Sequence, residues 1–277
     1  MRKSSKIASM LLVACLVVSS ILANIGPVNV YAAAVSGENT TQTLPIVLDF
    51  QGDTVNQVPA GWAEDATHAS ADAGKSTIQV VTDGDAGVNQ VVKFEQTAKR
   101  DSDYDMHYKF EATDKAVLEY RFKSESNSKN AWLPSFTYDG VGRDQPLYLQ
   151  LTEGGTELRY SGNGAEWGTA TRSLQNGWHT LKLVVNLEKN VRELYIDENP
   201  VTLDTSIVRW DCDTSKKISS VAAGFFRGIS NTAFFIDDLK VSEYVEEDPK
   251  IPFELDFEED TVNNVPTDWT DDAKHTN

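Results

Sequence analysis

The stretch that decides the fold is "NGWHTLKLVVNLEKNVRELYIDENPV", residues 176–201. It contains two short runs rich in Leu and Val, residues 179–187 and 191–197, and the charged segment 188–190 separates them. Two short apolar runs joined by a few polar residues predict antiparallel strands connected by a tight turn. The stretch therefore predicts a β-hairpin.

The same kind of pattern continues toward the N-terminus. In residues 117–125, Leu118, Tyr120 and Phe122 alternate with charged residues, and residues 146–151 alternate in the same way. Strict alternation predicts strands of a sheet that has one buried face. Clusters of Gly, Asn, Asp and Ser punctuate these runs as turns. Many short strands with turns between them predict an all-β fold, a two-sheet antiparallel β-sandwich or jelly roll.

The N-terminus is predicted to be a signal peptide over residues 1–34, because cations precede a long apolar run that ends in small residues. A lipoprotein box ending at Cys15 is an alternative, but the apolar run continues past it, which favours ordinary secretion. The protein is then extracellular or associated with the cell surface, with no membrane segment after cleavage. Cys212 remains the one cysteine of the mature chain, which excludes an intramolecular disulfide.

The overall charge restricts the class of partner. The chain carries a net charge of −17, and cleavage of the cationic leader would make it more negative. Such a surface repels nucleic acid and anionic lipid, so neither is a predicted partner. It also disfavours a polyanionic ligand unless a local basic patch is present.

The chain repeats its own beginning at its end. Residues 44–70 and 251–277 are identical at 14 of 27 positions. A repeat at this distance indicates duplication of a whole domain. We therefore expect a polar linker at 35–43, a sandwich domain at 44–247, and a joint with the start of a second copy at 248–277. The protein is predicted to be a monomer within a longer tandem chain.

The hairpin at residues 176–201 resembles the signature hairpin of concanavalin A-like lectin/glucanase jelly rolls, including laminin-G-like domains. In these domains a Gly-Trp pair starts one strand, and a Tyr-x-Asp near the end of the next leads into a turn. Residues 48–62 and 234–244 are similar to the first and last strands of carbohydrate-binding sandwiches in secreted bacterial polysaccharide-degrading enzymes. The resemblance covers about residues 44–247 and implies this fold, which hosts lectins, hydrolases, lyases and inert spacers.

Catalytic signatures are weak. Glycoside hydrolysis uses two facing carboxylates, and Glu193 and Asp197 share a strand face, but Tyr195 lies between them and breaks the glucanase pattern. A lyase would use a base such as His107 or His179, yet the strand motifs of jelly-roll alginate lyases are absent and His179 is expected to be structural. The sequence favours a non-catalytic module and leaves catalysis open.

Polysaccharide is the predicted ligand, because indole rings stack on sugars and polar side chains bind hydroxyl groups. Trp132 and Trp167 lie in polar surroundings, where an indole is less easily buried, and are predicted to be exposed stacking platforms. Strand alternation places polar side chains opposite buried neighbours, where they form a ligand surface if that sheet face is concave and a solvated face if it is not. The predicted ligand-binding residues are Trp132, Trp167, Tyr148, Gln150, Arg121, Arg143 and Arg159.

A structural calcium ion is the one predicted cofactor. Calcium suits a secreted, acidic chain without disulfides. The resemblance implies a site where the first and last strands meet, with Asp49, Asp237 and Asp238 as ligands. The alternative is that these aspartates only form turns.

These features together predict a secreted, non-catalytic carbohydrate-binding module of a tandem multidomain protein. One alternative is a structural or adhesive spacer without glycan binding. The other is a polysaccharide lyase or glycoside hydrolase with an unrecognised active site.

Overall fold

The computed structural model describes residues 42–64, 74–84, 89–125, 128, 130–138, 144–162, 166–171, 173–208 and 215–246. The predicted signal peptide, Cys15, Arg143, Cys212 and the predicted second copy lie outside these residues. Within the described segments, no helix is long and apolar enough to cross a membrane.

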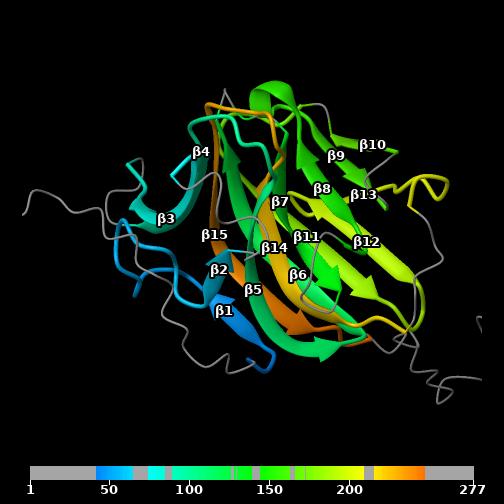
Figure 1. The fold of residues 1–277 in the computed structure, drawn as a ribbon. Coiled ribbons are helices and arrows are strands. Elements are labelled where there is room, and N and C mark those ends of the chain that lie inside the picture. Colours follow the sequence, from blue (N-terminus) through cyan, green and yellow to red (C-terminus); the bar gives the residue numbers. More distant parts are fainter. Residues whose placement is uncertain are drawn as a thin grey trace, which may run out of the picture.

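The chain forms two antiparallel sheets (Figure 1). The eight-stranded sheet has the order β13-β12-β11-β6-β15-β4-β3, with β1 paired to β15. Its strands are β1 (Ile46–Leu48), β3 (Ser76–Thr82), β4 (Gln90–Gln96), β6 (Lys115–Ser124), β11 (Trp178–Asn186), β12 (Val191–Ile196), β13 (Asn199–Val201) and β15 (Thr232–Glu243).

The seven-stranded sheet has the order β10-β9-β8-β7-β14-β5-β2. Its strands are β2 (Trp62–Glu64), β5 (Tyr104–Thr113), β7 (Ala131–Tyr138), β8 (Tyr148–Leu151), β9 (Leu158–Ser161), β10 (Gly168–Thr171) and β14 (Ile218–Phe225). The 3₁₀ turn η2 (Glu153–Gly155) lies between β8 and β9. The predicted all-β sandwich is confirmed.

The predicted hairpin at residues 176–201 is also confirmed. Strand β11 pairs with β12 from Leu181↔Ile196 to Asn186↔Val191. The turn between them ends at Asn190, whose φ of 54° lies in the left-handed region that Asn tolerates better than most residues.

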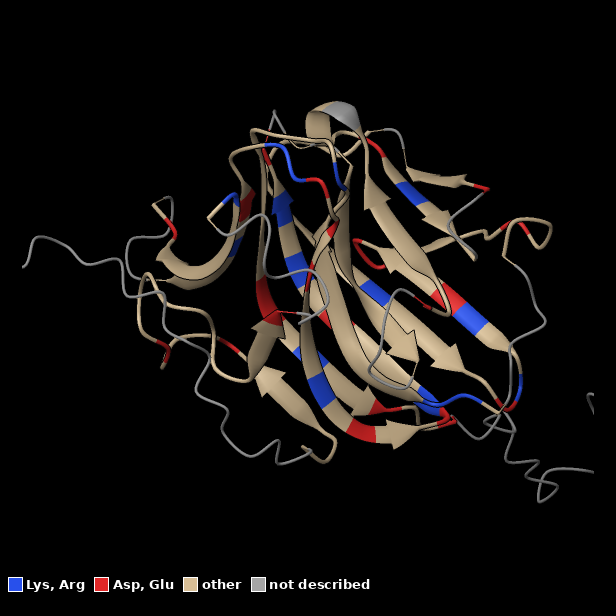
Figure 2. Cartoon of the chain, in the orientation of Figure 1, with Lys and Arg blue, Asp and Glu red and all other residues tan. Residues whose placement is uncertain are grey.

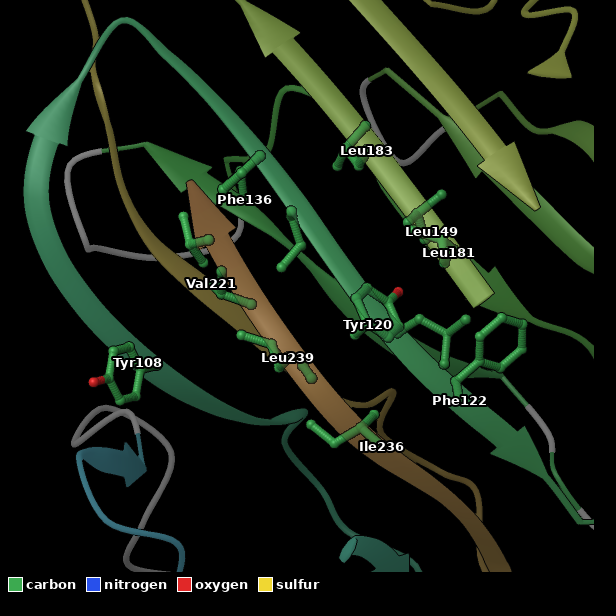
Figure 3. Close-up of a cluster of buried hydrophobic side chains, with 14 of the residues drawn as sticks. Tyr108, Tyr120, Phe122, Phe136, Leu149, Leu181, Leu183, Val221, Ile236 and Leu239 are labelled. Atoms are coloured by element: carbon green, nitrogen blue, oxygen red, sulfur yellow. The ribbon is translucent and has the colours of Figure 1, made fainter. Parts of the chain in front are cut away.

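The core lies between the inner faces of the two sheets (Figure 3). Leu118, Tyr120 and Phe122 are buried there, as their alternation predicts. The Tyr120 hydroxyl donates a hydrogen bond to the Pro134 carbonyl at 2.9 Å and so links β6 to β7 across the sandwich. This bond satisfies a polar group that would otherwise be costly to bury.

Gly224 permits the close approach of β14 to β5. A Cβ at this position would lie 1.8 Å from the Tyr104 carbonyl oxygen. Only glycine lets the two strands come together here. The pairing that results sets the register of the seven-stranded sheet around Asp105.

Candidate functional site

One lateral row of residues crosses the outer face of the seven-stranded sheet. Directly opposed residues of neighbouring antiparallel strands project to the same face. Gln150 projects outward because its neighbours Leu149 and Leu151 are buried in the core. The paired residues from β5 to β10 are Asp105, Gly224, Trp132, Gln150, Arg159 and Thr169, and we call them the cross-sheet row.

Hydrogen bonds hold the polar end of the cross-sheet row. Glu157 Oε1 accepts from Arg159 Nε at 3.0 Å and from Thr169 Oγ1 at 3.2 Å. Gln150 Nε2 donates to Asn130 Oδ1 at 3.2 Å. The Arg159 side chain is nevertheless 42% exposed. Its guanidinium group can therefore donate to a ligand while Glu157 orients it.

The two predicted stacking platforms have different surroundings. Trp132 is only 5% exposed, and its ring packs edge-on against Phe226 with centroids 4.2 Å apart. The predicted exposure of Trp132 is therefore wrong, because the loop after β14 covers its ring. Trp167 is half-buried and directly precedes β10. Part of the Trp167 residue therefore remains exposed at this end of the sheet.

A buried histidine–aspartate pair occupies the β5 end of the face. His107 and Asp105 project outward because Tyr104, Met106 and Tyr108 fill the core side of β5. His107 Nε2 lies 3.0 Å from Asp105 Oδ2, and the residues are 4% and 2% exposed.

The pairing determines where the His107 ring carries a proton. A carboxylate only accepts, so Nε2 carries the proton that faces Asp105. Within the part of the chain described, Nδ1 has no hydrogen-bond partner. Small residues lie alongside, because Ala222 pairs with His107 and Ser135 pairs with Ala222. The sequence interpretation considered His107 as a lyase base but missed Asp105, although alternation along β5 puts both on one face.

The predicted ligand-binding residues divide between the two sheets. Trp132, Tyr148, Gln150 and Arg159 lie on the seven-stranded sheet, and Trp167 borders it. Arg121 instead projects from β6 of the eight-stranded sheet, where its guanidinium group lies 4.9 Å from the Trp178 ring centroid. The prediction that Arg121 shares one ligand surface with the other residues is therefore wrong. Alternation shows that a side chain faces outward, but it does not show to which of the two sheets its strand belongs. Arg143 lies outside the described residues.

The two weak catalytic candidates on β11 and β12 are engaged in structural contacts. Glu193 accepts from the Tyr195 hydroxyl at 2.8 Å. His179 is buried, with Nδ1 2.8 Å from Asp197 Oδ2 and Nε2 2.9 Å from the Gln175 carbonyl oxygen. Glu193 and Asp197 are thus each held by a different partner.

The first and last strands do meet, since Leu48 pairs with Leu239. Asp237 is 1% exposed, and its Oδ2 accepts from Asn89 Nδ2 at 2.9 Å. Burial raises the pKa of the Asp237 carboxyl. Arg121 lies 3.6 Å from Asp237 and 3.3 Å from Asp238, so one cation already neutralises part of this charge.

The carboxylate that lies next to Asp237 is that of Asp238. Among the residues that the structure describes, no three His, Cys, Asp or Glu side chains come together as metal ligands. Carbonyl oxygens do gather near by. The Gln90 amide, oriented to donate, lies 2.8 Å from Phe50 O, 3.0 Å from Asp53 O and 3.2 Å from Gln51 O. The Gln51 side chain donates to Asn89 Oδ1 at 2.8 Å and so connects this turn to Asp237.

Comparisons with known proteins support the fold. No protein-family model matches the sequence, and no curated protein matches it either. Among solved structures, the chain is similar to the cellulose-induced protein Cip1, with 10% identity, 72% of this chain and 97% of that chain covered, and a TM-score of 0.50.

Two further structures show weaker similarity. The carbohydrate recognition domain of Emp47p has 14% identity, 71% and 94% coverage, and a TM-score of 0.44. A sialidase has 12% identity and a TM-score of 0.48, with 66% of this chain covered but only 17% of the sialidase. These two similarities carry no further argument, and the 10% identity to Cip1 bears on the fold alone. With the two sheets described above, the chain has the concanavalin A-like lectin/glucanase β-sandwich fold.

Proposed function

We propose that this protein is a non-catalytic carbohydrate-binding module that holds a polysaccharide along the cross-sheet row. The observation that carries the proposal is the pairing of Gln150, Arg159 and Thr169 on one outer face, with the Arg159 guanidinium group exposed. The Arg159 guanidinium group and the Thr169 hydroxyl can bind sugar hydroxyls, whereas Gln150 is only 9% exposed and its amide already donates to Asn130. The fold is shared by carbohydrate-binding and carbohydrate-active proteins, which is consistent with such a ligand.

Trp167 supplies the apolar part of this proposed site. It borders β10, and Gly168 pairs with Tyr160 on β9 next to Arg159. An indole there can stack on the C–H face of a sugar ring while Arg159 binds its hydroxyls. The polar groups project from strands, which are already ordered before the ligand arrives. Binding therefore loses little conformational entropy in side chains or loops. Export from the cell and tandem copies that raise avidity are part of the same proposal.

A structural calcium ion is part of the proposal as well. Asp237 and the turn at residues 50–53 would hold it, because calcium takes carboxylate and carbonyl oxygens. The support is the group of backbone carbonyls around Gln90 and its connection through Gln51 and Asn89 to Asp237. Asp49 and Asp238 would contribute only after rearrangement, since Asp49 Oδ1 accepts from the Gln51 N–H and Asp238 pairs with Arg121.

Polysaccharide cleavage is the second candidate function. One observation favours it: the buried pair of His107 and Asp105 lies on the same sheet face as the cross-sheet row. A histidine held by a carboxylate is a typical general base. Cleavage would appear as new reducing ends or unsaturated products, and His107→Ala would remove them.

Affinity electrophoresis of the full chain tests binding. Gels containing xylan, β-glucan, pectin or fructan would retard the protein when the polysaccharide binds. We expect one of them to retard the wild type, and Arg159→Ala to weaken retardation. Lys217→Ala is the matched control, since it removes a cation that pairs with Asp114 far from the row. If no polysaccharide retards the folded protein, the structural spacer becomes the better interpretation.

A further inference from the structure

The outer face of the eight-stranded sheet contains a hollow that lies apart from the cross-sheet row. Its volume is about 490 Å³, within the range of roughly 300–1,000 Å³ that is usual for small-molecule sites. Its floor comes from two rows of paired residues. Glu119 pairs with Lys182, which pairs with Tyr195, and Arg121 pairs with Thr180 in the neighbouring row.

Two backbone irregularities border the hollow on either side of β11 and β6. On the β12 side, Asp197 and Glu198 form a turn with φ values of 50° and 65°. On the β15 side, the register shifts between Asp237 and Lys240, and Asp238 has a φ of 50°. Both features place an acidic side chain at the rim, Glu198 on one side and Asp238 on the other. Bulges and left-handed turns commonly redirect side chains in this way.

The side chains of the hollow offer an aromatic ring and charges of both signs. Lys182 Nζ lies 5.6 Å from the Tyr195 ring centroid, and Lys182 forms no ion pair within the described strands. Arg121 lies between the hollow and the Trp178 ring. Glu119, Glu198 and Asp238 are the acidic residues. Figure 2 shows the two signs interspersed on the strands of this sheet.

The mixture of positive and negative side chains around the hollow favours an uncharged ligand. A polyanion would meet Glu119, Glu198 and Asp238, and a polycation would meet Arg121 and Lys182, so either would face repulsion. A neutral polyol uses both signs, because each hydroxyl both donates and accepts. The Tyr195 ring can cover the apolar face of a sugar.

We propose that this hollow is a second saccharide-binding site, selective for neutral oligosaccharides, on the opposite side of the sandwich from the cross-sheet row. The two sites share no residue, so each can exist without the other. If both bind, one molecule can hold two glycan strands and cross-link a polysaccharide matrix.

Tryptophan indole N–H resonances of the full chain report on the two faces separately. Trp178 touches Arg121 at the hollow, whereas Trp132 and Trp167 belong to the cross-sheet row and its border. The chain is titrated with cellohexaose, laminarihexaose, xylohexaose and mannohexaose, and with hexagalacturonate as the anionic probe. At least one neutral hexasaccharide is expected to shift Trp178. Tyr195→Ala is expected to weaken that binding roughly tenfold or more.

Tyr195→Phe is the matched control, because it keeps the ring and removes only the hydroxyl that donates to Glu193. It should retain binding at the hollow. Shifts confined to Trp132 and Trp167 would leave the proposed function intact and overturn the second site. The second site is equally overturned by no Trp178 shift with any neutral hexasaccharide, by a shift that survives Tyr195→Ala, or by tighter binding of hexagalacturonate there. A Trp178 shift alone would support the hollow and count against the cross-sheet row.

Discussion

His179 and Asp197 join strand β11 to the turn after β12, with His179 Nδ1 2.8 Å from Asp197 Oδ2. The other ring nitrogen, Nε2, faces the Gln175 carbonyl oxygen at 2.9 Å. The pair thus fixes the turn that places Glu198 at the rim of the hollow.

The first prediction concerns acid stability. Burial, the largest single influence, pushes the pKa of Asp197 upward, but hydrogen bonds from His179 and Thr180 together outweigh it and hold this pKa below its usual value. A carboxyl group whose pKa is lower in the folded state than in the unfolded state stabilises the fold. This stabilisation is fully present at pH values above the unfolded-state pKa, and it is lost as the pH falls through the folded-state pKa. Because the Asp197 side chain is 47% exposed and water screens its interactions, Asp197→Asn should cost only about 0.5 kcal/mol near neutral pH.

This cost should shrink below about pH 4, where the carboxyl group of the unfolded wild type begins to protonate. Urea unfolding of both proteins from neutral to acidic pH measures it. Asn tolerates the left-handed backbone at position 197, so backbone strain does not confuse the comparison. A stability difference that stayed constant into strong acid would contradict the assignment.

The second prediction concerns the phenol that spans the core. Burial raises the pKa of Tyr120 well above its usual value, and its hydroxyl donates to the Pro134 carbonyl. Tyr120→Phe should cost about 1–2 kcal/mol at neutral pH, because it leaves a buried carbonyl without this donor.

Alkali should reduce the difference between these two proteins. A raised pKa means that this tyrosine's stabilisation is present below the unfolded-state pKa and declines as pH rises above about 10. Wild type should therefore lose more stability than Tyr120→Phe between neutral and strongly alkaline pH, as monitored by urea midpoints. Equal losses would show that Tyr120 ionises as freely in the folded state as in the unfolded one.

The third prediction tests the glycine under the cross-sheet row. Gly224→Ala would place a methyl group 1.8 Å from the Tyr104 carbonyl oxygen, so the strands must separate, at a cost of about 3 kcal/mol or more. Gly52→Ala is the control, because a Cβ there meets nothing within 4 Å. Thermal unfolding should show a large loss for the first variant and little change for the second. Equal unfolding temperatures would refute the close-approach argument.

The fourth prediction separates the two indoles of the row face. Trp132→Ala should destabilise the fold by about 3 kcal/mol, because a buried ring that packs on Phe226 leaves a cavity. Trp167→Ala should leave stability nearly unchanged but weaken retardation in the affinity gels. The measurements are urea unfolding and gel mobility on both variants. Unchanged mobility for a folded Trp167→Ala would remove this indole from the proposed site.

The fifth prediction tests the calcium proposal. A ligand that binds only the folded state at one hundred times its dissociation constant adds about 2.7 kcal/mol of stability. Millimolar calcium should therefore raise the unfolding temperature above that in EGTA, and Asp237→Asn should abolish the rise. The Asp49→Asn variant should respond almost like the wild type, because Asp49 Oδ1 already accepts a hydrogen bond from the Gln51 N–H and would bind calcium only after rearrangement. Identical unfolding curves in calcium and EGTA would reject the ion.

Much of the fold could be predicted from local pattern. Alternation correctly placed Leu118, Tyr120 and Phe122 in the core and Gln150 on the opposite sheet face from Leu149 and Leu151, since a strand turns successive side chains to opposite faces whatever it pairs with. It did not predict that Gln150 would be only 9% exposed on that face. The hairpin at 176–201 followed from the same local rule and from its short charged turn.

The site depended on contacts between distant residues. Arg121 and Gln150 both alternate outward, yet β6 pairs with β11 and β15 while β8 pairs with β7 and β9, so they lie on opposite sides of the sandwich. Trp132 is buried because Phe226, far along the chain, packs on its ring. Asp105 joins the cross-sheet row only through Gly224.

The sequence alone therefore determined which side chains face the core and which face outward, because that depends on the backbone repeat of each strand. Only the tertiary structure decided which outward side chains share a surface. Strand order is set by the packing of the whole sandwich, and no local period encodes it.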